Sequence, residues 1–270
     1  MTQGVVLVTG ASSGIGALTA SQLAAKGWRV FAASRRATAP AGCEGLAMDV
    51  DQDASVATGV ARIVEASGRL DAIVLCAGWG IAGAVEDTTA AEAKAQFETH
   101  FFGAHRVVHA AVPQMRRQGS GRIVLVSSLV AAVPIPFQAF YSASKAALTN
   151  YAEALRMELV PSGIQVSCIE PGNFQTGFTG SRRRASGWTA GSPQSATCAA
   201  SVEWMENDEK RAPPPDAVVR TIAGLLEAPA PPFRRVVVAF ALERAGTWLR
   251  AILPYTWWEA IALKVFRIRQ

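Results

Sequence analysis

The sequence predicts an α/β protein, a single domain built around a Rossmann-type, doubly wound parallel sheet of about seven strands. Two features of the chain carry this prediction. Over the first two thirds, continuous apolar runs of strand length alternate with amphipathic stretches of helix length. Unbroken apolar strands separated by helices are typical of a parallel sheet that helices cover on both faces. In addition, a glycine-rich turn joins the first apolar run to the first helical stretch.

Strands are expected in chain order wherever a short apolar or β-branched run occurs. These runs are Val5–Val8, Arg29–Ala33, Gly45–Met48, Ala72–Leu75, Arg122–Ser127, Ile164–Ile169 and Arg235–Phe240. Helices are expected between them, where an amphipathic stretch is closed by glycine or proline. The helical stretches are Ile15–Lys26, Asp53–Ser67, Thr89–Gln118 and Phe140–Leu159.

The last third of the chain has a different composition. Residues 177–215 are rich in Ser, Gly, Arg and Pro, which predicts a flexible substrate loop region. Residues 241–270 predict an aromatic-rich, helical C-terminal extension. We interpret residues 1–270 as one domain with a loop-rich C-terminal substrate lobe.

Composition excludes several classes of protein. Half of the 270 residues are hydrophobic and 17% are charged, so a disordered chain is not expected. The net charge is +5, but the densest basic cluster, Arg182–Arg184, is too short for a nucleic-acid groove and is interpreted as a solvated loop. We therefore expect no nucleic-acid partner.

The cysteines and the apolar runs bear on the compartment. The four cysteines are widely spaced and form no CxxC pattern, which predicts reduced thiols in a cytoplasmic protein. The first apolar run is too short for a signal peptide, and no run of 18 uncharged apolar residues predicts a membrane-spanning helix.

The turn after the first strand has the features of a phosphate-binding turn. Its sequence is TGASSGIG, from Thr9 to Gly16. Gly10 would allow the tight turn, Gly14 would let the backbone approach a pyrophosphate, and Gly16 would let the helix pack on the strand. The N-terminus of the following helix would offer N–H groups and a partial positive charge. The candidate cofactor-binding residues here are Gly10, Ser12, Ser13, Gly14, Ile15 and Gly16.

The end of the second strand indicates which dinucleotide is bound. A ribose 2′-hydroxyl is usually held by a carboxylate, whereas a 2′-phosphate is held by a guanidinium. Here Arg35 and Arg36 follow the strand, and the next acidic residue is Glu44. The sequence therefore favours NADP(H) over NAD(H), with Arg35 on the phosphate. The alternative is that both arginines only solvate a loop.

A tyrosine and a lysine four residues apart provide a candidate acid–base pair. Tyr141 and Lys145 share one face near the start of a helix. A tyrosine with a pKa of about 10 is a poor base at neutral pH, and a nearby ammonium is expected to lower that pKa. Such a pair could exchange a proton with a carbonyl or alcohol oxygen while a nicotinamide exchanges hydride.

Together these motifs resemble the short-chain dehydrogenase/reductase superfamily over roughly residues 4–240. TGASSGIG is similar to the glycine turn of that family, and Ser128 lies 13 residues before Tyr141, as the catalytic serine of the family does. Further matches are the Asp49-Val50 pair, Cys76-Ala77-Gly78 in place of Asn-Ala-Gly, and Pro171-Gly172 followed by Thr176.

The resemblance implies roles for these residues. Ser128 would hydrogen-bond the substrate oxygen, and Tyr141 would be the general acid in reduction or the base in oxidation. Lys145 would bind the nicotinamide ribose and lower the pKa of Tyr141. Asp49 would meet the adenine and Thr176 the carboxamide; Val50, Cys76, Ala77, Gly78, Pro171 and Gly172 complete the implied cofactor site. The family commonly assembles as a homodimer or homotetramer.

All three histidines lie between residues 100 and 109. His105 and His109 lack a cysteine or carboxylate at matching spacing, so no metal site is expected. His100 stands where the family carries the asparagine of its catalytic tetrad, whose main-chain carbonyl holds a relay water. If the backbone performs that role, histidine can replace asparagine with little loss; if the side chain matters, the relay is altered here. An imidazole with a pKa near 6.5 could add a titrating group to the relay; the alternative is that it only shapes the helix.

The aromatic C-terminus leaves two questions open. Five of the seven tryptophans follow residue 187: Trp188, Trp204, Trp248, Trp257 and Trp258. They could line a pocket for a bulky apolar substrate, or simply fix the C-terminal helices to the core. The apolar stripe from Trp257 to Ile268 could contact a partner subunit or, less in keeping with a cytoplasmic enzyme, a membrane surface.

The leading hypothesis is an NADP(H)-dependent oxidoreductase that interconverts a carbonyl and a secondary alcohol on a small molecule. One alternative is an NAD-dependent alcohol dehydrogenase of the same fold. Another is a non-catalytic NADP-sensing regulator, which would have no need of Ser128, Tyr141 and Lys145.

Overall fold

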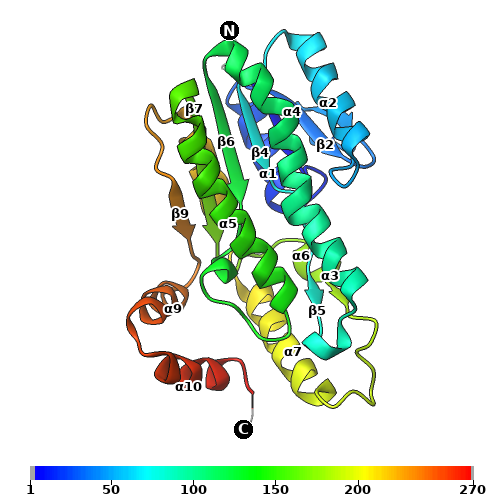
Figure 1. Cartoon of the computed structure of the whole chain (residues 1–270), viewed down its shortest axis with the longest axis vertical. Coiled ribbons are helices and arrows are strands. Elements are labelled where there is room, and N and C mark those ends of the chain that lie inside the picture. Colours follow the sequence, from blue (N-terminus) through cyan, green and yellow to red (C-terminus); the bar gives the residue numbers. More distant parts are fainter. Residues whose placement is uncertain (1–3, 269–270) are drawn as a thin grey trace.

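The computed structural model describes residues 4–268, so the first three and last two residues of the expected domain lie outside it. Its centre is a seven-stranded sheet in the order β3-β2-β1-β4-β6-β7-β9, in which every pairing is parallel (Figure 1). The strands are β1 (Val5–Thr9), β2 (Arg29–Ser34), β3 (Glu44–Ala47), β4 (Ala72–Leu75), β6 (Gly121–Val126), β7 (Ile164–Pro171) and β9 (Arg234–Val237). This arrangement confirms the predicted Rossmann-type fold.

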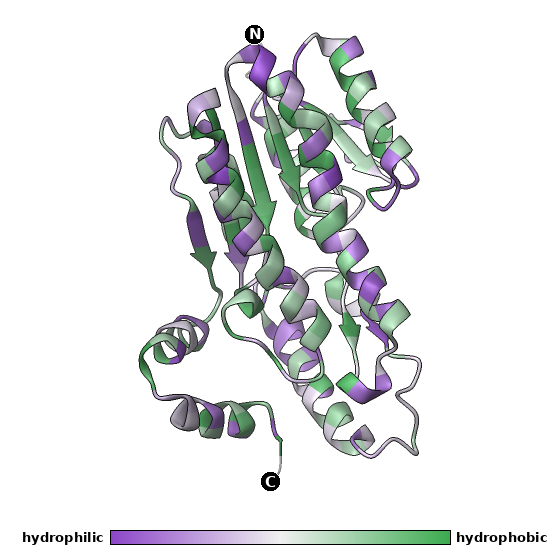
Figure 2. Ribbon diagram, in the orientation of Figure 1, coloured by the Kyte–Doolittle hydropathy of each residue, from purple (hydrophilic) through white to green (hydrophobic). Residues whose placement is uncertain are grey.

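Helices cover both faces of the sheet. On one face lie α2 (Asp53–Ser67), α4 (Gly103–Gln118) and α5 (Ala139–Leu159); on the other lie α1 (Gly14–Ala25) and α8 (Asp216–Glu227). Because side chains alternate along a strand, Val5 and Leu7 enter the first core cluster, whereas Val6 and Val8 enter the second. The inner strands β1 and β4 are therefore buried along their whole length and apolar at every position but Thr9, and the strands at the centre of the sheet are mostly green in Figure 2.

The helix predicted over Thr89–Gln118 is divided by a π-helical turn. It consists of α3 (Ala90–Phe97), the π turn η2 (Glu98–Phe102) and α4. Apolar periodicity does not reveal such a turn, because one inserted residue hardly alters the pattern. π turns often occur at functional sites, and this one contains His100.

The substrate lobe is more ordered than the loop expected over residues 177–215. It contains α6 (Phe178–Ser181), the short strand β8 (Arg183–Arg184) paired with β5 (Ile81–Ala82), and α7 (Ser195–Arg211). The difference arises because Cys198, Val202 and Met205 lie on one face of α7 and bury against Ala82. Their i, i+4, i+7 spacing was present in the sequence, but the polar composition around it obscured it.

The C-terminal extension is helical, as predicted, but in two pieces. Helix α9 (Ala241–Ile252) and helix α10 (Tyr255–Val265) are separated at Pro254. Three short 3-10 turns, η1 (Val85–Asp87), η3 (Leu129–Ala131) and η4 (Val160–Ser162), complete the described elements. No helix within residues 4–268 combines the length and the apolar character that crossing a membrane requires.

Candidate active site

A cavity of about 480 Å³ lies at the carboxyl ends of the central strands, where the strand order reverses between β1 and β4. Open α/β sheets bind ligands at this position. Every site residue predicted from the sequence lines it. They are Gly10, Ser12, Ser13, Gly14, Ile15, Gly16, Arg35, Asp49, Val50, Cys76, Ala77, Gly78, His100, Ser128, Tyr141, Lys145, Pro171, Gly172 and Thr176.

The glycine turn has no room for side chains at two positions. Gly10 has a φ of 66°, and a Cβ there would lie 2.8 Å from Ala77 Cα. A Cβ on Gly16 would lie 2.4 Å from the carbonyl oxygen of Gly10. Thr9 fixes the turn from below, because its Oγ1 accepts hydrogen bonds from the backbone N–H groups of Cys76 (3.1 Å) and Ala77 (3.3 Å). Thr9 therefore positions this turn, a role that the sequence motifs do not indicate.

The start of helix α1 fits a pyrophosphate. Ser13 occupies the N-cap but makes no side-chain hydrogen bond to the helix. The N-terminal N–H groups and the helix dipole are therefore available to an anion. A Cβ added at Gly14 would lie 3.7 Å from Cβ of Thr176, so the loop after β7 closes over the turn. These residues fit a dinucleotide.

Of the charged residues of β2 and the segment that follows it, Arg35 lines the cavity and Glu44 does not. Arg35 is exposed at the carboxyl end of β2 and lines the cavity. Glu44 forms an ion pair with Arg29 at the opposite end of this strand, with an N–O distance of 2.7 Å. Asp51, which also lines the cavity, accepts a hydrogen bond from Thr99 (3.0 Å).

Ser128, Tyr141 and Lys145 meet on the floor of the cavity. Ser128 follows β6, and its Oγ accepts a hydrogen bond from the N–H of Val130 (3.3 Å). Tyr141 and Lys145 lie in the first two turns of α5. The ammonium of Lys145 donates to the carbonyl oxygen of Val126 (2.9 Å) and lies 6.0 Å from the centre of the Tyr141 ring.

The electrostatics of this group differ from the prediction that Lys145 lowers the pKa of Tyr141. Burial raises the pKa of Tyr141 to about 12, and a hydrogen bond with Ser128 opposes this only in part. Burial also lowers the pKa of Lys145 to about 8. Desolvation thus dominates the pKa of Tyr141 in this structure, and Tyr141 holds its proton at neutral pH.

His100 is buried, with protein partners on both ring nitrogens. Its Nε2 accepts a hydrogen bond from the N–H of Trp79 (3.0 Å), and its Nδ1 lies 3.0 Å from Oγ of Ser144. Because that hydroxyl donates to the carbonyl oxygen of Tyr141 (2.8 Å), the partners assign the imidazole proton to Nδ1. Gly78 is required beside the ring, since a Cβ there would lie 2.9 Å from Nε2.

The expectation of a pKa near 6.5 for His100 is wrong. Burial, and after it the nearby Lys145, lower the pKa of His100 well below its usual value. The neutral ring braces the start of α5 against the turn after β4, which is a structural role. The backbone of His100 also lies in the π turn. The family resemblance implies that the main-chain carbonyl at this position holds the relay water.

Replacing His100 by asparagine is expected to change how stability depends on pH. The pKa of His100 in the folded state lies below its unfolded value of 6.5. The unfolded chain therefore takes up the proton first as the pH falls. The neutral ring therefore contributes to the free energy of unfolding above pH 6.5. Below that pH this contribution is lost, by up to about 1.4 kcal/mol per pH unit. Urea unfolding between pH 7 and pH 5 should be steeper in pH for the parent than for His100→Asn.

The rate should behave differently from the stability. The profiles of log kcat against pH for the two proteins are expected to overlay, because the ring does not titrate in the working range. Parallel stability curves, or an inflection near pH 6.5 that only the parent shows, would contradict this account.

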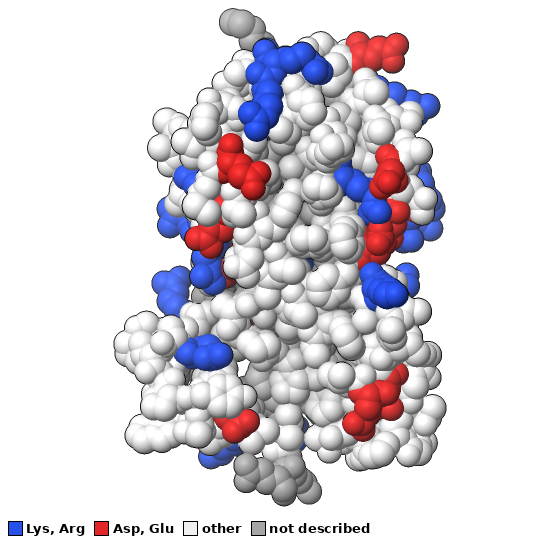
Figure 3. Space-filling view, in the orientation of Figure 1, with Lys and Arg blue, Asp and Glu red and all other residues white. Residues whose placement is uncertain are grey.

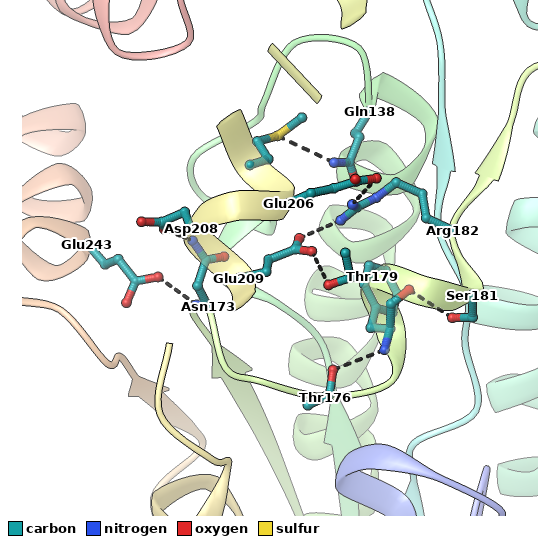
Figure 4. A network of polar contacts seen from close by, with 12 residues as sticks. Gln138, Asn173, Thr176, Thr179, Ser181, Arg182, Glu206, Asp208, Glu209 and Glu243 are labelled. Atoms are coloured by element: carbon teal, nitrogen blue, oxygen red, sulfur yellow. Dashed lines mark hydrogen bonds and ion pairs between the residues drawn. The ribbon is translucent and has the colours of Figure 1, made fainter. Parts of the chain in front are cut away.

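The substrate side of the cavity is held by a polar network that Figure 4 shows. Arg182, whose side chain is only 2% exposed, forms ion pairs with Glu206 and Glu209 of α7. Glu209 lines the cavity and accepts a hydrogen bond from Thr179. The interpretation of the Arg182–Arg184 run as a solvated loop is therefore wrong for Arg182. Glu206 and Glu209, which lie one helical turn apart in the sequence, were the signal that a cation such as Arg182 could pair with this helix.

The same lobe contacts Tyr141 and the loop after β7. The Phe178 ring lies 5.3 Å from the Tyr141 ring, and the Arg182 guanidinium lies 5.5 Å from the Phe178 ring. Glu243 at the start of α9 accepts a hydrogen bond from the N–H of Asn173 (2.6 Å), next to Gly172. Helices α7 and α9 therefore both brace residues beside the catalytic group.

Replacing Arg182 by methionine is expected to loosen this wall. Glu206 and Glu209 would repel each other without their cation, at a cost of about 1–3 kcal/mol. This is below the range for a fully buried pair, because Glu206 is partly exposed. Urea unfolding would measure the loss, and kcat/KM should fall about tenfold as Phe178 loses its support. Arg184→Met is the control, since Arg184 is exposed and stacks on Trp188. An equal loss of stability and of kcat/KM in both variants would contradict this role of Arg182.

The late tryptophans do not line the cavity within the described part of the chain. Trp188 and Trp204 pack against the α7 cluster, and Trp258 is buried, so these three fix the lobe in place. Trp248 and Trp257 are exposed. The cavity-lining tryptophan is Trp79, over which the Arg183 guanidinium stacks at 4.2 Å.

The other two histidines lie away from the cavity. His105 contacts the hydroxyl of Tyr151 (3.1 Å), and its ring centre lies 6.0 Å from that of His109. Between residues 4 and 268, no three His, Cys, Asp or Glu side chains are grouped so as to hold a metal ion.

Comparison with known proteins shows the family of this chain. The sequence model of the short chain dehydrogenase family matches residues 4–187. A 3-ketodihydrosphingosine reductase of Bacteroides thetaiotaomicron is 35% identical over 249 residues, which cover 91% of this chain and 93% of that protein. Human 17-beta-hydroxysteroid dehydrogenase type 1 is 35% identical over 195 residues, covering 65% of this chain and 60% of that protein.

A solved structure is similar over nearly the whole chain. A short-chain dehydrogenase from Streptomyces avermitilis superposes with a TM-score of 0.81 at 31% identity, covering 96% of this chain and 98% of that one. The protein therefore belongs to the short-chain dehydrogenase/reductase family, as its motifs predict, and is an oxidoreductase acting on CH–OH donors, in a family that uses nicotinamide cofactors.

Proposed function

We propose that the protein is an NADP(H)-dependent reductase that converts the carbonyl of a bulky apolar small molecule to a secondary alcohol. The observation that carries the proposal is that Ser128, Tyr141 and Lys145 line one cavity together with the glycine turn. The Tyr141 hydroxyl is protonated at neutral pH and hydrogen-bonded with Ser128, so it can act as the general acid when a carbonyl is reduced. The relative named as a 3-ketodihydrosphingosine reductase supports this direction.

The cofactor would lie along the cavity, and different lining residues would bind each of its parts. The glycine turn and the start of α1 would hold the pyrophosphate, while Asp49 and Val50 would meet the adenine. Ala77, Gly78 and the backbone of Cys76 would border the adenosine ribose. Lys145 would hold the nicotinamide ribose, and Pro171, Gly172 and Thr176 the carboxamide. When bound, the nicotinamide supplies hydride to the carbonyl carbon.

The protein's own groups act on the substrate oxygen. Ser128 would orient the carbonyl through its Oγ, and Tyr141 would transfer its phenolic proton to the oxygen as negative charge develops there. Lys145, whose pKa is lowered to about 8, would be a cation near Tyr141 at neutral pH. Its charge would stabilise the phenolate that proton transfer leaves. The carbonyl of His100 would hold the water through which the proton is replaced.

Preference for NADP(H) rests on Arg35. Its exposed guanidinium stands at the end of β2 with no acidic residue beside it in the chain. A 2′-phosphate there would gain a charge-assisted hydrogen bond, whereas a 2′-hydroxyl would lack the carboxylate that usually holds it.

An apolar substrate is supported by apolar side chains in the lining of the cavity. They include Val130, Ile135, Phe174 and Phe178. The relatives named for 3-ketodihydrosphingosine and for a hydroxysteroid support the same class.

The test is turnover with a panel of apolar ketones in the presence of NADPH or NADH, followed by absorbance of the reduced cofactor. We expect consumption of NADPH to exceed that of NADH and to increase with the apolar size of the ketone. Binding of NADPH with no turnover of any ketone would instead favour the regulator.

Assembly and location complete the proposal. A homodimer or homotetramer formed through α4 and α5 is supported by an aromatic group at their junction, where the Phe101 ring lies 5.2 Å from Phe102 and 5.5 Å from Tyr151. Phe102 is 46% exposed. The four free cysteines support a cytoplasmic location.

A further inference from the structure

Exposed large hydrophobic side chains are concentrated on the two C-terminal helices. The described residues include twelve such side chains, and seven of them lie between Leu242 and Val265. These seven form the C-terminal apolar patch: Leu242, Trp248, Ile252, Tyr255, Trp257, Ile261 and Val265. Scattered exposed hydrophobics are ordinary, but a contiguous group marks a surface that contacts something else.

Helix α10 has one broad apolar face, and only part of it packs on the protein. Trp258 and the following residue Phe266 are buried, and the Phe266 ring lies 5.7 Å from Trp204 of α7. Trp257, Ile261 and Val265 follow one another at i, i+4 and i+8 along the adjoining edge of this face, and all three are exposed. Attachment of α10 to the substrate lobe therefore does not account for the exposed part of the face.

Cations accompany this patch. The two helices and the residues that follow them carry Arg244, Arg250, Lys264 and Arg267, against Glu243 and Glu259. Glu243 is already engaged by Asn173, which leaves Glu259 as the acidic group not bound to the core. The visible surface over α9 and α10 has few charged side chains, at the lower left of Figure 3.

We propose that the C-terminal apolar patch docks on the surface of a bilayer that contains anionic lipids. Tryptophan and tyrosine favour the boundary between headgroups and acyl chains, where their rings are buried and their polar atoms stay hydrated. Flanking Lys and Arg extend toward anionic headgroups. This combination is typical of a helix that lies in the membrane interface.

A second copy of the chain fits the patch less well. The four cations of the two helices and the residues that follow them outnumber the two acidic residues, so two such patches would bring excess positive charge together. A bilayer with anionic headgroups supplies the complementary charge.

The helices that carry the patch are joined to segments that line the cavity. Glu243 joins α9 to the loop beside Gly172, and α7, on which α10 packs, carries the cavity residue Glu209. An apolar substrate dissolved in the bilayer would therefore enter the cavity from the docked face. This second step rests on the proposed function; docking itself does not.

Co-sedimentation with vesicles tests the docking. The probes are vesicles of phosphatidylcholine alone and of phosphatidylcholine mixed with an equal part of phosphatidylglycerol. We expect the full chain to bind the mixed vesicles more tightly, and the triple variant Trp248→Gln, Trp257→Gln, Ile261→Gln to lose about tenfold or more in affinity. The matched control is Met157→Gln with Val160→Gln, two exposed hydrophobics at the end of α5 that should leave binding unchanged.

Three results would overturn docking. They are no binding of the parent chain to either vesicle, equal binding by the triple variant, and an equal loss in the α5 control. A triple variant that alters the sedimentation coefficient without altering vesicle binding would assign the patch to a second copy instead. Because the substituted side chains are exposed, circular dichroism should show an unchanged fold.

Turnover separates docking from the proposed function. The triple variant should reduce a water-soluble ketone at the parent rate but a vesicle-dissolved ketone at least about tenfold more slowly. Equal rates on both ketones would remove the delivery step and leave docking standing. Inactivity of the parent on every ketone would refute the proposed function without touching the vesicle result.

Discussion

Replacing Tyr141 by phenylalanine is expected to lower kcat for carbonyl reduction by about 10²–10⁴-fold, the range that general acids contribute. The variant removes one hydroxyl from a ring that also contacts Phe178 and the edge of His100. Packing of the site should therefore be retained. Single-turnover consumption of NADPH with an apolar ketone measures the loss.

Cofactor binding separates a chemical effect of Tyr141→Phe from a structural one. The Kd for NADPH, from quenching of protein fluorescence, should stay within about twofold of the parent value, because binding rests mainly on the glycine turn and Arg35. Turnover within about threefold of the parent rate would show that Tyr141 does not donate the proton.

Replacing Arg35 by aspartate is expected to reverse the cofactor preference. Loss of a hydrogen bond to a charged group, together with repulsion by the new carboxylate, should reduce kcat/KM for NADPH by about 10- to 100-fold or more. The kcat/KM for NADH should stay unchanged or rise, because aspartate can accept a hydrogen bond from the ribose 2′-hydroxyl. Initial rates with each cofactor at a fixed ketone concentration measure both effects.

Arg36→Asp provides a matched control for this reversal. Arg36 is also exposed, and it is the next residue in the chain, but the cavity is lined by Arg35. Its replacement should change the preference by less than about threefold, apart from weak long-range repulsion that salt screens. An unchanged preference in Arg35→Asp, or equal effects of both variants, would refute the assignment of the 2′-phosphate to Arg35.

The sequence predicts the fold in detail because the determinants of this fold are local. Helix α2 has its predicted bounds, Asp53–Ser67, and β4 is the predicted Ala72–Leu75. Gly68 ends the helix in a left-handed conformation, and the four apolar residues of β4 are all buried, so the sequence around each element determines its bounds. The candidate site was likewise foreseeable, because its backbone-binding parts follow strands whose carboxyl ends meet at one edge of a parallel sheet.

What could not be predicted depends on contacts between distant parts of the chain. Arg182 is buried only because α7 brings Glu206 and Glu209 to it. The hydrogen bonds of the His100 ring depend on Trp79 and Ser144, which lie 21 residues before and 44 residues after it, and its neutral state depends on burial and on Lys145. The pKa of Tyr141 is governed by burial, which the spacing to Lys145 does not reveal.

In the proposed reaction, this chain moves hydride from NADPH to a carbonyl carbon while Tyr141 protonates the oxygen. A single turnover with NADPH that carries deuterium at the transferred C4 position, with mass analysis of the product, tests this reaction. We expect an alcohol with one deuterium on its carbinol carbon, formed rapidly by the parent and about 10²–10⁴-fold more slowly by Tyr141→Phe. An alcohol without deuterium, or equal rates in the two proteins, would contradict it.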